Sequence, residues 1–118
     1  AEQLVGTPYR TGGATTRGFD CSGFVNYLFK EEAGISLPRS SRELMTMAEQ
    51  RVSRSDLEPG DILLFNRNGR GRVSHTGIYL GDNRFIHSSS HRSGGVRIDS
   101  LSNGYWNKSY LAAKRVLN

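Results

Sequence analysis

The feature that most limits the fold of this chain is a change in the spacing of its apolar residues near Pro59-Gly60. Before this point, one stripe recurs at the spacing of a helix face and consists of Phe24, Val25, Leu28 and Phe29. After it, the apolar run 62–65 is too short for a helix and predicts a buried strand. Helices followed by several short strands indicate an α+β fold with an antiparallel sheet.

The length of 118 residues suits one domain, and we expect a single domain over residues 1–118. No apolar run approaches the roughly 20 residues that cross a bilayer, so we expect no transmembrane segment. The sequence starts at Ala1 without a basic and apolar leader. We therefore expect any signal peptide or lipid anchor to be absent or removed.

Capping signals predict two helices. The first is expected from about Asp20, a good N-cap residue, to about Ala33, with Gly34 as its C-terminal stop. The second is expected from Ser40, where the spacing of a capping box begins, to about Gln50. Both helices precede the predicted sheet, which is expected to start after Pro59-Gly60.

Short strands are predicted in the second half of the chain. Besides 62–65, they are expected at about 73–80, 84–89 and 96–100. Gly81-Asp82-Asn83 is expected to be a hairpin loop. Segment 109–117 is ambiguous, because its composition favours a helix and its place after a run of strands favours another strand.

The single cysteine, Cys21, excludes an internal disulfide and is a candidate nucleophile in a chain that also has three histidines. The alternative is an inert buried thiol, which is common for free cysteine. Cys21 falls in the first turn of the predicted helix, where the positive end of the helix dipole would lower its pKa. A nucleophilic role also requires a base nearby.

His75 and His87 are the candidate bases. If 81–83 is a three-residue loop, Gly77 pairs with His87, and the two imidazoles share one face of the hairpin. A two-residue turn would shift the register by one and put them on opposite faces. In such a triad, the first imidazole takes the thiol proton and the second orients the first.

The formal net charge of +5 favours an anionic partner, which could be nucleic acid, acidic lipid or a cell-wall polymer. A nucleic-acid-binding module is therefore one alternative, and it predicts salt-sensitive binding that survives Cys21→Ala. A zinc site is another, because the spacing of His87 and His91 resembles that of zinc ligands. The loop around His91 has no turn that would direct this side chain back towards the other candidate ligands. We expect His91 to be exposed to solvent. We expect no metal, no other cofactor and no nucleic acid.

Six short motifs follow one another along almost the whole chain. They are Gly6-Thr7-Pro8-Tyr9, Asp20-Cys21-Ser22-Gly23-Phe24, Leu37-Pro38-Arg39-Ser40, Pro59-Gly60-Asp61-Ile62, His75-Thr76-Gly77-Ile78-Tyr79 and Phe85-Ile86-His87. In this order they resemble the NlpC family of bacterial cell-wall cysteine peptidases. The resemblance implies a papain-like α+β fold in which N-terminal helices pack on a five- or six-stranded antiparallel sheet, with 109–117 as a strand.

The resemblance also implies roles for individual residues. Cys21 matches the nucleophile of the family, His75 its base and His87 its orienting residue. Tyr9 matches a tyrosine that helps to polarise the scissile carbonyl. Two further pairs match positions near the substrate, and these are Asp20 with Ser22 and Arg39 with Ser40.

The substrates that the resemblance implies are peptidoglycan stem peptides. The bond would be the γ-D-glutamyl to diamino-acid bond or the D-alanine to diaminopimelate cross-link, and the sequence does not choose between them. An amidase that cuts the sugar to peptide bond, or an acyltransferase, would use the same triad. The resemblance further implies a monomer in the bacterial cell envelope or a secreted protein.

Overall fold

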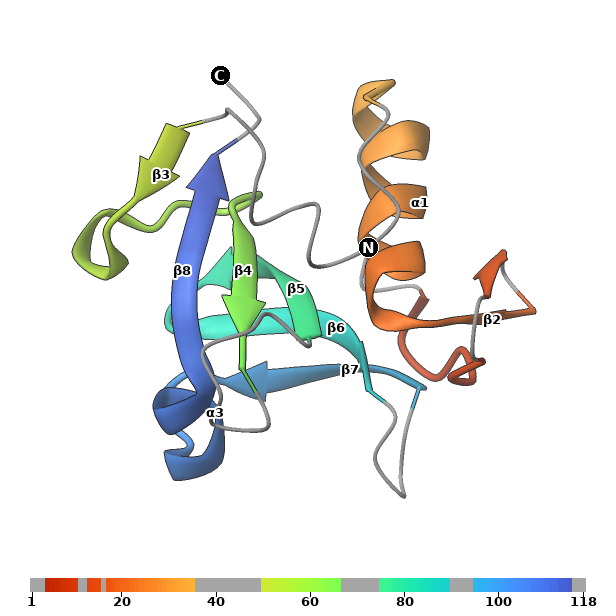
Figure 1. Ribbon diagram of the computed structural model, residues 1–118. Coiled ribbons are helices and arrows are strands. Elements are labelled where there is room, and N and C mark those ends of the chain that lie inside the picture. The colour runs from red at the N-terminus through yellow and green to blue at the C-terminus, as the bar shows by residue number, and fades with distance from the viewer. Residues whose placement is uncertain are drawn as a thin grey trace.

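The computed structural model describes residues 4–10, 13–15, 17–35, 50–66, 75–89 and 95–115. One long helix packs against an antiparallel sheet of six strands, which confirms the predicted α+β class (Figure 1). The predicted helix from Ser40 to Gln50 lies almost wholly outside the described residues, which resume at residue 50. Among the described helices, none has the length and apolar character needed to cross a membrane.

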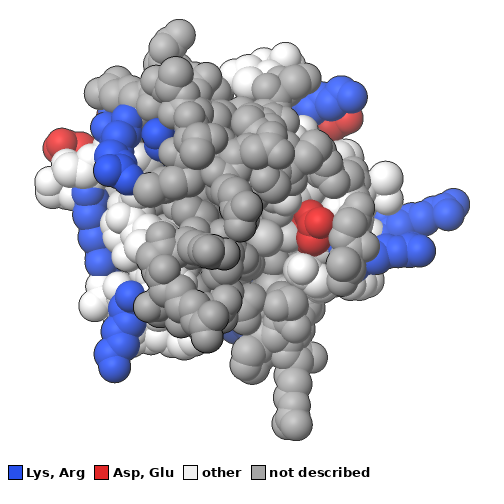
Figure 2. Space-filling model, in the orientation of Figure 1, with Lys and Arg blue, Asp and Glu red and all other residues white. Residues whose placement is uncertain are grey.

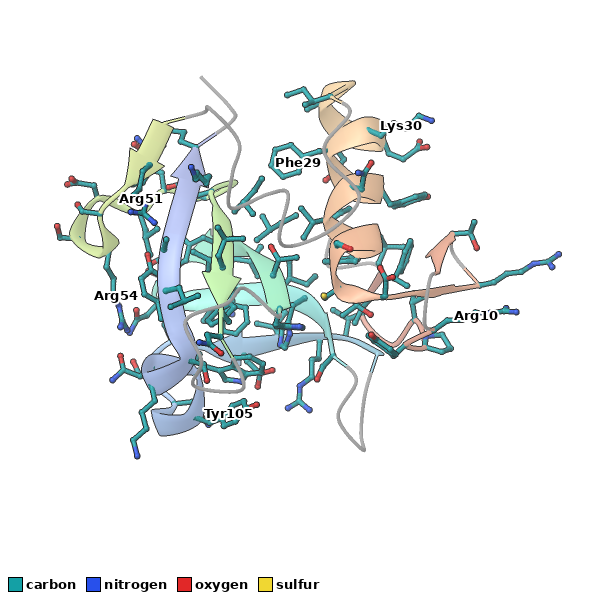
Figure 3. All side chains as sticks on the ribbon, in the orientation of Figure 1. Arg10, Phe29, Lys30, Arg51, Arg54 and Tyr105 are labelled. Atoms are coloured by element: carbon teal, nitrogen blue, oxygen red, sulfur yellow. The ribbon has the colours of Figure 1, made fainter. Side chains whose placement is uncertain are left out.

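Helix α1 spans Cys21–Ala33, as its capping residues predict. The Asp20 side chain accepts a hydrogen bond from the Gly23 backbone N–H at 2.6 Å, and Gly34 ends the helix in the left-handed region with a φ of 66°. The predicted apolar stripe is buried. Figure 3 shows Phe29 of this stripe on the side of α1 that faces the sheet and Lys30 on the opposite side.

The order of the strands across the sheet is β3-β8-β4-β5-β6-β7, and neighbouring strands are antiparallel. The strands span Gln50–Val52 (β3), Ile62–Phe65 (β4), His75–Gly81 (β5), Arg84–Ser89 (β6), Gly95–Ser100 (β7) and Tyr110–Arg115 (β8). The strands predicted near 62–65, 73–80, 84–89 and 96–100 are thus confirmed. Strand β8 resolves the ambiguous C-terminal segment in favour of a strand.

In the part of the chain that the structure describes, five short elements were not predicted from the sequence. They are the strands β1 (Ala14–Thr15), β2 (Gly18–Phe19) and β3, the 3-10 helix η2 (Arg54–Asp56) and the helix α3 (Gly104–Ser109). Each is six residues or shorter, too short for a periodic apolar pattern. Because β3 precedes Pro59, the expectation that strands begin only after Pro59-Gly60 is wrong.

Two apolar clusters cover the two faces of the sheet. One lies between α1 and the sheet and includes Ile62, Leu64, Ile78 and Ile86. The other includes Leu63, Phe65, Phe85 and Trp106. Because successive side chains of a strand point to opposite faces, the even and odd positions of β4 divide between these clusters. The same alternation places the side chains of His75 and His87 on the face that Trp106 covers.

Candidate active site

The β5–β6 hairpin carries both candidate histidines. Its register pairs Ile78 with Ile86 and Tyr79 with Phe85, which is the predicted register. The predicted loop length is wrong, because Gly81 pairs with Arg84 across the two-residue turn Asp82-Asn83, whose φ values are both positive. An irregularity between Tyr79 and Gly81 absorbs one residue and restores the register.

The two imidazoles meet on one face of the hairpin. His75 Nε2 lies 2.7 Å from His87 Nδ1, a hydrogen-bond distance, and both side chains are almost fully buried. Gly77 lies opposite His87, where a Cβ on Gly77 would stand only 3.0 Å from the Cβ of His87. The absence of a side chain at residue 77 therefore leaves room for the His87 ring.

A carboxylate extends this contact to the next strand. His87 Nε2 lies 2.7 Å from Asp99 Oδ2 on β7, and Arg97 Nε lies 2.9 Å from the same oxygen. The hydrogen bond from His87 is the main reason why the pKa of Asp99 is lowered, and it outweighs the effect of burial. Asp99 was not among the site residues predicted from the sequence. Its position follows from the β6–β7 register, which pairs Phe85 with Asp99 and which the sequence between the two strands does not fix.

Trp106 of α3 packs against both histidines. Its ring centroid lies 5.3 Å from that of His75 and 4.8 Å from that of His87. The indole also contacts the rings of Phe65 and Phe85 and is 7% exposed. Trp106 is the one tryptophan of the chain. Because no sequence signal predicted α3, the contact of Trp106 with the histidines was not predicted. This aromatic cover keeps water from the bond between the imidazoles.

Cys21 begins α1 and is partly exposed. The backbone of Thr76, the residue after His75, lowers the pKa of the Cys21 thiol by hydrogen bonding. Thr76 is the second residue of β5, so the start of α1 and the start of β5 meet at the thiol.

Burial raises the pKa of the Cys21 thiol, contrary to the expectation from the helix dipole alone. Hydrogen bonds from the backbone of Thr76, Ser22 and Cys21 itself lower this pKa, and the charge of Asp20 raises it. The N-terminus of α1 therefore acts in the predicted direction but is outweighed by desolvation. A neutral thiol at rest needs a base to take its proton.

A family model supplies the observation that decides the family. The model of the NlpC/P60 family matches residues 6–115. The chain belongs to the NlpC/P60 family.

Similar proteins extend this NlpC/P60 assignment. The murein DD-endopeptidase MepS/murein LD-carboxypeptidase of Escherichia coli strain K12 is 49% identical over 113 residues, which are 96% of this chain and 57% of that protein. The gamma-DL-glutamyl hydrolase of Bacillus subtilis strain 168 is 41% identical over 119 residues, which cover 100% of this chain and 28% of that protein. A crystal structure of an NlpC/P60 family protein from Bacillus cereus superposes with a TM-score of 0.90 at 33% identity and covers 99% of this chain and 38% of that one. The chain thus spans little more than half, or less, of the length of these relatives.

The remaining candidate residues of this NlpC/P60 chain are placed as follows. Tyr9 is half-buried and forms a bridge with Phe19, two residues before Cys21. Asp20 caps α1 through one carboxylate oxygen, and Ser22 is buried at 7% exposure. Two further substrate candidates, Arg39 and Ser40, lie outside the described residues, as does His91.

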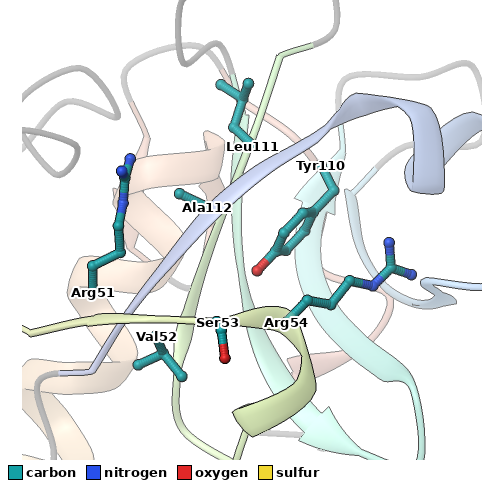
Figure 4. Close-up of a pocket in the computed structure, with 7 residues that line it drawn as sticks. All are labelled: Arg51, Val52, Ser53, Arg54, Tyr110, Leu111 and Ala112. Atoms are coloured by element: carbon teal, nitrogen blue, oxygen red, sulfur yellow. The ribbon is translucent and has the colours of Figure 1, made fainter.

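One pocket lies at the opposite edge of the sheet from β5 and β6. It lies between β3, the turn that follows it and β8 (Figure 4), and it is lined by Arg51, Val52, Ser53, Arg54, Tyr110, Leu111 and Ala112. None of the candidate catalytic residues lines it. In the described part of the chain, no cluster of three or more His, Cys, Asp or Glu side chains is arranged to hold a metal ion. Figure 2 shows the described Lys and Arg side chains at several separate edges of one face of the molecule.

Proposed function

We propose that this chain is the catalytic domain of a cysteine hydrolase that cuts peptide bonds of peptidoglycan stem peptides. Cys21 is the nucleophile, His75 the general base and His87 the residue that orients the base. The observation that carries the proposal is the 2.7 Å contact between the two buried imidazoles, beside the strand residue that binds the Cys21 thiol. Membership of the NlpC/P60 family supports it.

The contact between the imidazoles supports an assignment of the reacting atoms. His75 Nε2 faces His87, so Nδ1 is the nitrogen of His75 that accepts the thiol proton. The thiol binds the backbone of Thr76, which is one peptide unit away from the Cα of His75. Cys21 itself is partly exposed, as a nucleophile that meets an incoming peptide must be.

The reaction has two halves. As the Cys21 sulfur attacks the carbonyl carbon, its proton passes to His75, and a tetrahedral intermediate forms. The carbon–nitrogen bond then breaks while His75 gives the proton to the leaving amine, which leaves a thioacyl enzyme. Water attacks this thioester and loses a proton to His75, and the acid product departs as the thiol is restored. Because burial raises the thiol pKa, proton transfer accompanies the attack.

Other residues assist in this scheme. The phenol of Tyr9 donates a hydrogen bond to the developing oxyanion. Asp20, Ser22, Arg39 and Ser40 contribute to the substrate site. Asp20 also caps α1, since one of its carboxylate oxygens receives the Gly23 N–H.

The bond and the setting are also part of the proposal. The relative with 49% identity is named a murein DD-endopeptidase, and the one with 41% identity is named a gamma-DL-glutamyl hydrolase. The higher identity favours the D-alanine to diaminopimelate cross-link over the γ-D-glutamyl bond. We propose that the enzyme acts as a monomer in the cell envelope or outside the cell, without a metal or another cofactor.

Digestion of purified sacculi, followed by mass analysis of the soluble products, tests the reaction and the bond together. Cleavage of the cross-link converts dimeric muropeptides to monomers, and cleavage at γ-D-glutamate shortens the stem peptide. An amidase would instead release intact stem peptides from the sugar chain. Cys21→Ala, which removes a partly exposed sulfur, should fold normally and give no products. If the wild-type protein produced no new peptide end in the sacculi, the proposal would be overturned.

A further inference from the structure

A buried chain of hydrogen bonds continues beyond the proposed triad. It runs from His75 Nε2 to His87 Nδ1 at 2.7 Å and from His87 Nε2 to Asp99 Oδ2 at 2.7 Å. The two imidazoles are 1% and 0% exposed, and the Asp99 side chain is 15% exposed. The sequence of contacts therefore ends at a carboxylate that the proposed triad does not include.

The carboxylate decides which nitrogens carry protons. An ionised carboxylate only accepts hydrogen bonds, so His87 Nε2 must carry a hydrogen to bind Asp99 Oδ2. In a neutral ring this makes His87 Nδ1 an acceptor, and His75 Nε2 must then be the donor. Neutral His75 therefore has its lone pair on Nδ1, the nitrogen that takes the thiol proton in the proposed mechanism.

The opposite arrangement is inactive. If His87 carried its hydrogen on Nδ1, its Nε2 lone pair would face the lone pairs of Asp99 at 2.7 Å. His75 would then accept at Nε2 and carry its hydrogen on Nδ1, where it could not take a proton from the thiol. The repulsion between Asp99 and an unprotonated Nε2 excludes this arrangement.

We propose that Asp99 is a positioning residue that fixes the tautomers of both histidines and so makes His75 Nδ1 the base. This inference rests on the proposed function, because it concerns the proton acceptor of that mechanism. No proton leaves or enters Asp99 during the reaction. When His75 becomes an imidazolium, its charge is stabilised through His87 by the negative charge of the carboxylate.

Arg97 holds the carboxylate in place. Its Nε lies 2.9 Å from Oδ2, the oxygen that His87 contacts, and one of its terminal nitrogens donates to Oδ1 at 3.2 Å. This ion pair and this hydrogen bond hold the carboxylate beside His87. Trp106 packs on both imidazoles and keeps competing water from the bond between them. Both nitrogens of the His87 ring are thus held by partners whose own positions are fixed.

Nuclear magnetic resonance of protein labelled with 15N in histidine reads the tautomers without any substrate. His91→Gln removes the resonances of the third histidine and so completes the assignment. At neutral pH, the wild-type protein should show both His75 and His87 with hydrogen on Nε2. Hydrogen on Nδ1 of either ring would overturn the inference, while the digestion of sacculi would still show by itself whether the chain hydrolyses peptidoglycan. Loss of hydrolysis with the expected tautomers would instead count against the proposed function.

Two variants separate the charge of Asp99 from its role as an acceptor. Asp99→Asn keeps an oxygen for His87 and should lower kcat about 10-fold with the tautomers unchanged. Asp99→Leu removes the acceptor and should lower kcat about 100-fold, with mixed tautomers in both rings and an unchanged KM.

Asp61→Asn is the matched control. Asp61 is likewise an aspartate held by an arginine, since its two oxygens each receive a hydrogen bond from Arg115 at 2.9 Å, and it is buried. This variant should lose stability while its tautomers and kcat stay those of the wild type. If Asp99→Leu kept the wild-type tautomers and kcat, Asp99 would have no positioning role.

Discussion

Gly77→Ala is the smallest change that should disturb the histidine pair. A Cβ at residue 77 would stand 3.0 Å from His87 Cβ, 3.0 Å from the Ile86 carbonyl oxygen and 3.1 Å from Phe85 Cδ2. Two of these neighbours belong to the strand backbone or lie next to it, and they yield only by moving β6. The His87 ring is meanwhile bound on both sides, by His75 and by Asp99.

The size of the effect follows from two opposing contributions. Overpacking a tightly filled site costs about 1–3 kcal/mol, and replacing glycine stabilises by roughly 0.4–1 kcal/mol through the unfolded chain. The net loss in the free energy of unfolding should be about 1–2 kcal/mol, or a fall in Tm of about 5 °C. A shift of His87 by a few tenths of an ångström should lower kcat by roughly 3- to 10-fold, since about 1 Å costs on the order of 100-fold.

Thermal unfolding and the initial rate of muropeptide cleavage measure the two effects. Gly104→Ala is the control, because Gly104 is the first residue of α3 and a Cβ there would meet nothing within 4 Å. This control should keep the wild-type rate and lose no stability. If Gly77→Ala matched Gly104→Ala in both measurements, the argument that space beside His87 matters for the base would be refuted.

Three further outcomes are expected. His87→Ala should retain a slow residual hydrolysis, roughly 10- to 100-fold below wild type, because His75 keeps its reactive nitrogen but loses its fixed orientation. The pKa of Asp99 is lowered in the folded protein, so its contacts stabilise the fold above about pH 4. This stabilisation is lost as the pH falls through the pKa of the folded state. The Tm difference between the wild type and Asp99→Asn should therefore shrink from pH 7 to pH 3. Trp106→Ala should destabilise the protein by about 3–5 kcal/mol in chemical denaturation, whereas Trp106→Phe should keep most of the activity, since the phenyl ring still covers the imidazoles.

Local signals were sufficient to predict α1 and the faces of the hairpin. Asp20 and Gly34 mark the ends of the helix through side-chain and backbone geometry that each residue carries by itself. The common face of His75 and His87 was predicted from a three-residue loop. The tight turn at Asp82-Asn83 gives the same register only because an irregularity in β5 offsets it.

Features that depend on distant packing could not be predicted. Asp99 reaches His87 through the register of β6 with β7, and the sequence between these strands does not fix that register. Trp106 reaches the imidazoles from a helix too short to show periodicity. The direction of the Cys21 pKa shift depends on how deeply the folded chain buries the thiol, which neither the cap nor the dipole of α1 reveals.

The transfer of the Cys21 proton to His75 can be tested by alkylation with iodoacetamide as a function of pH in the wild type and in His75→Ala. Burial raises the pKa of the thiol, so a thiol without a base should react appreciably only at strongly alkaline pH. The wild type should react at least about 10-fold faster than His75→Ala at pH 7, with the two rates converging as the pH rises. Identical rates for the two proteins across the neutral range would contradict the pairing of this sulfur with this imidazole.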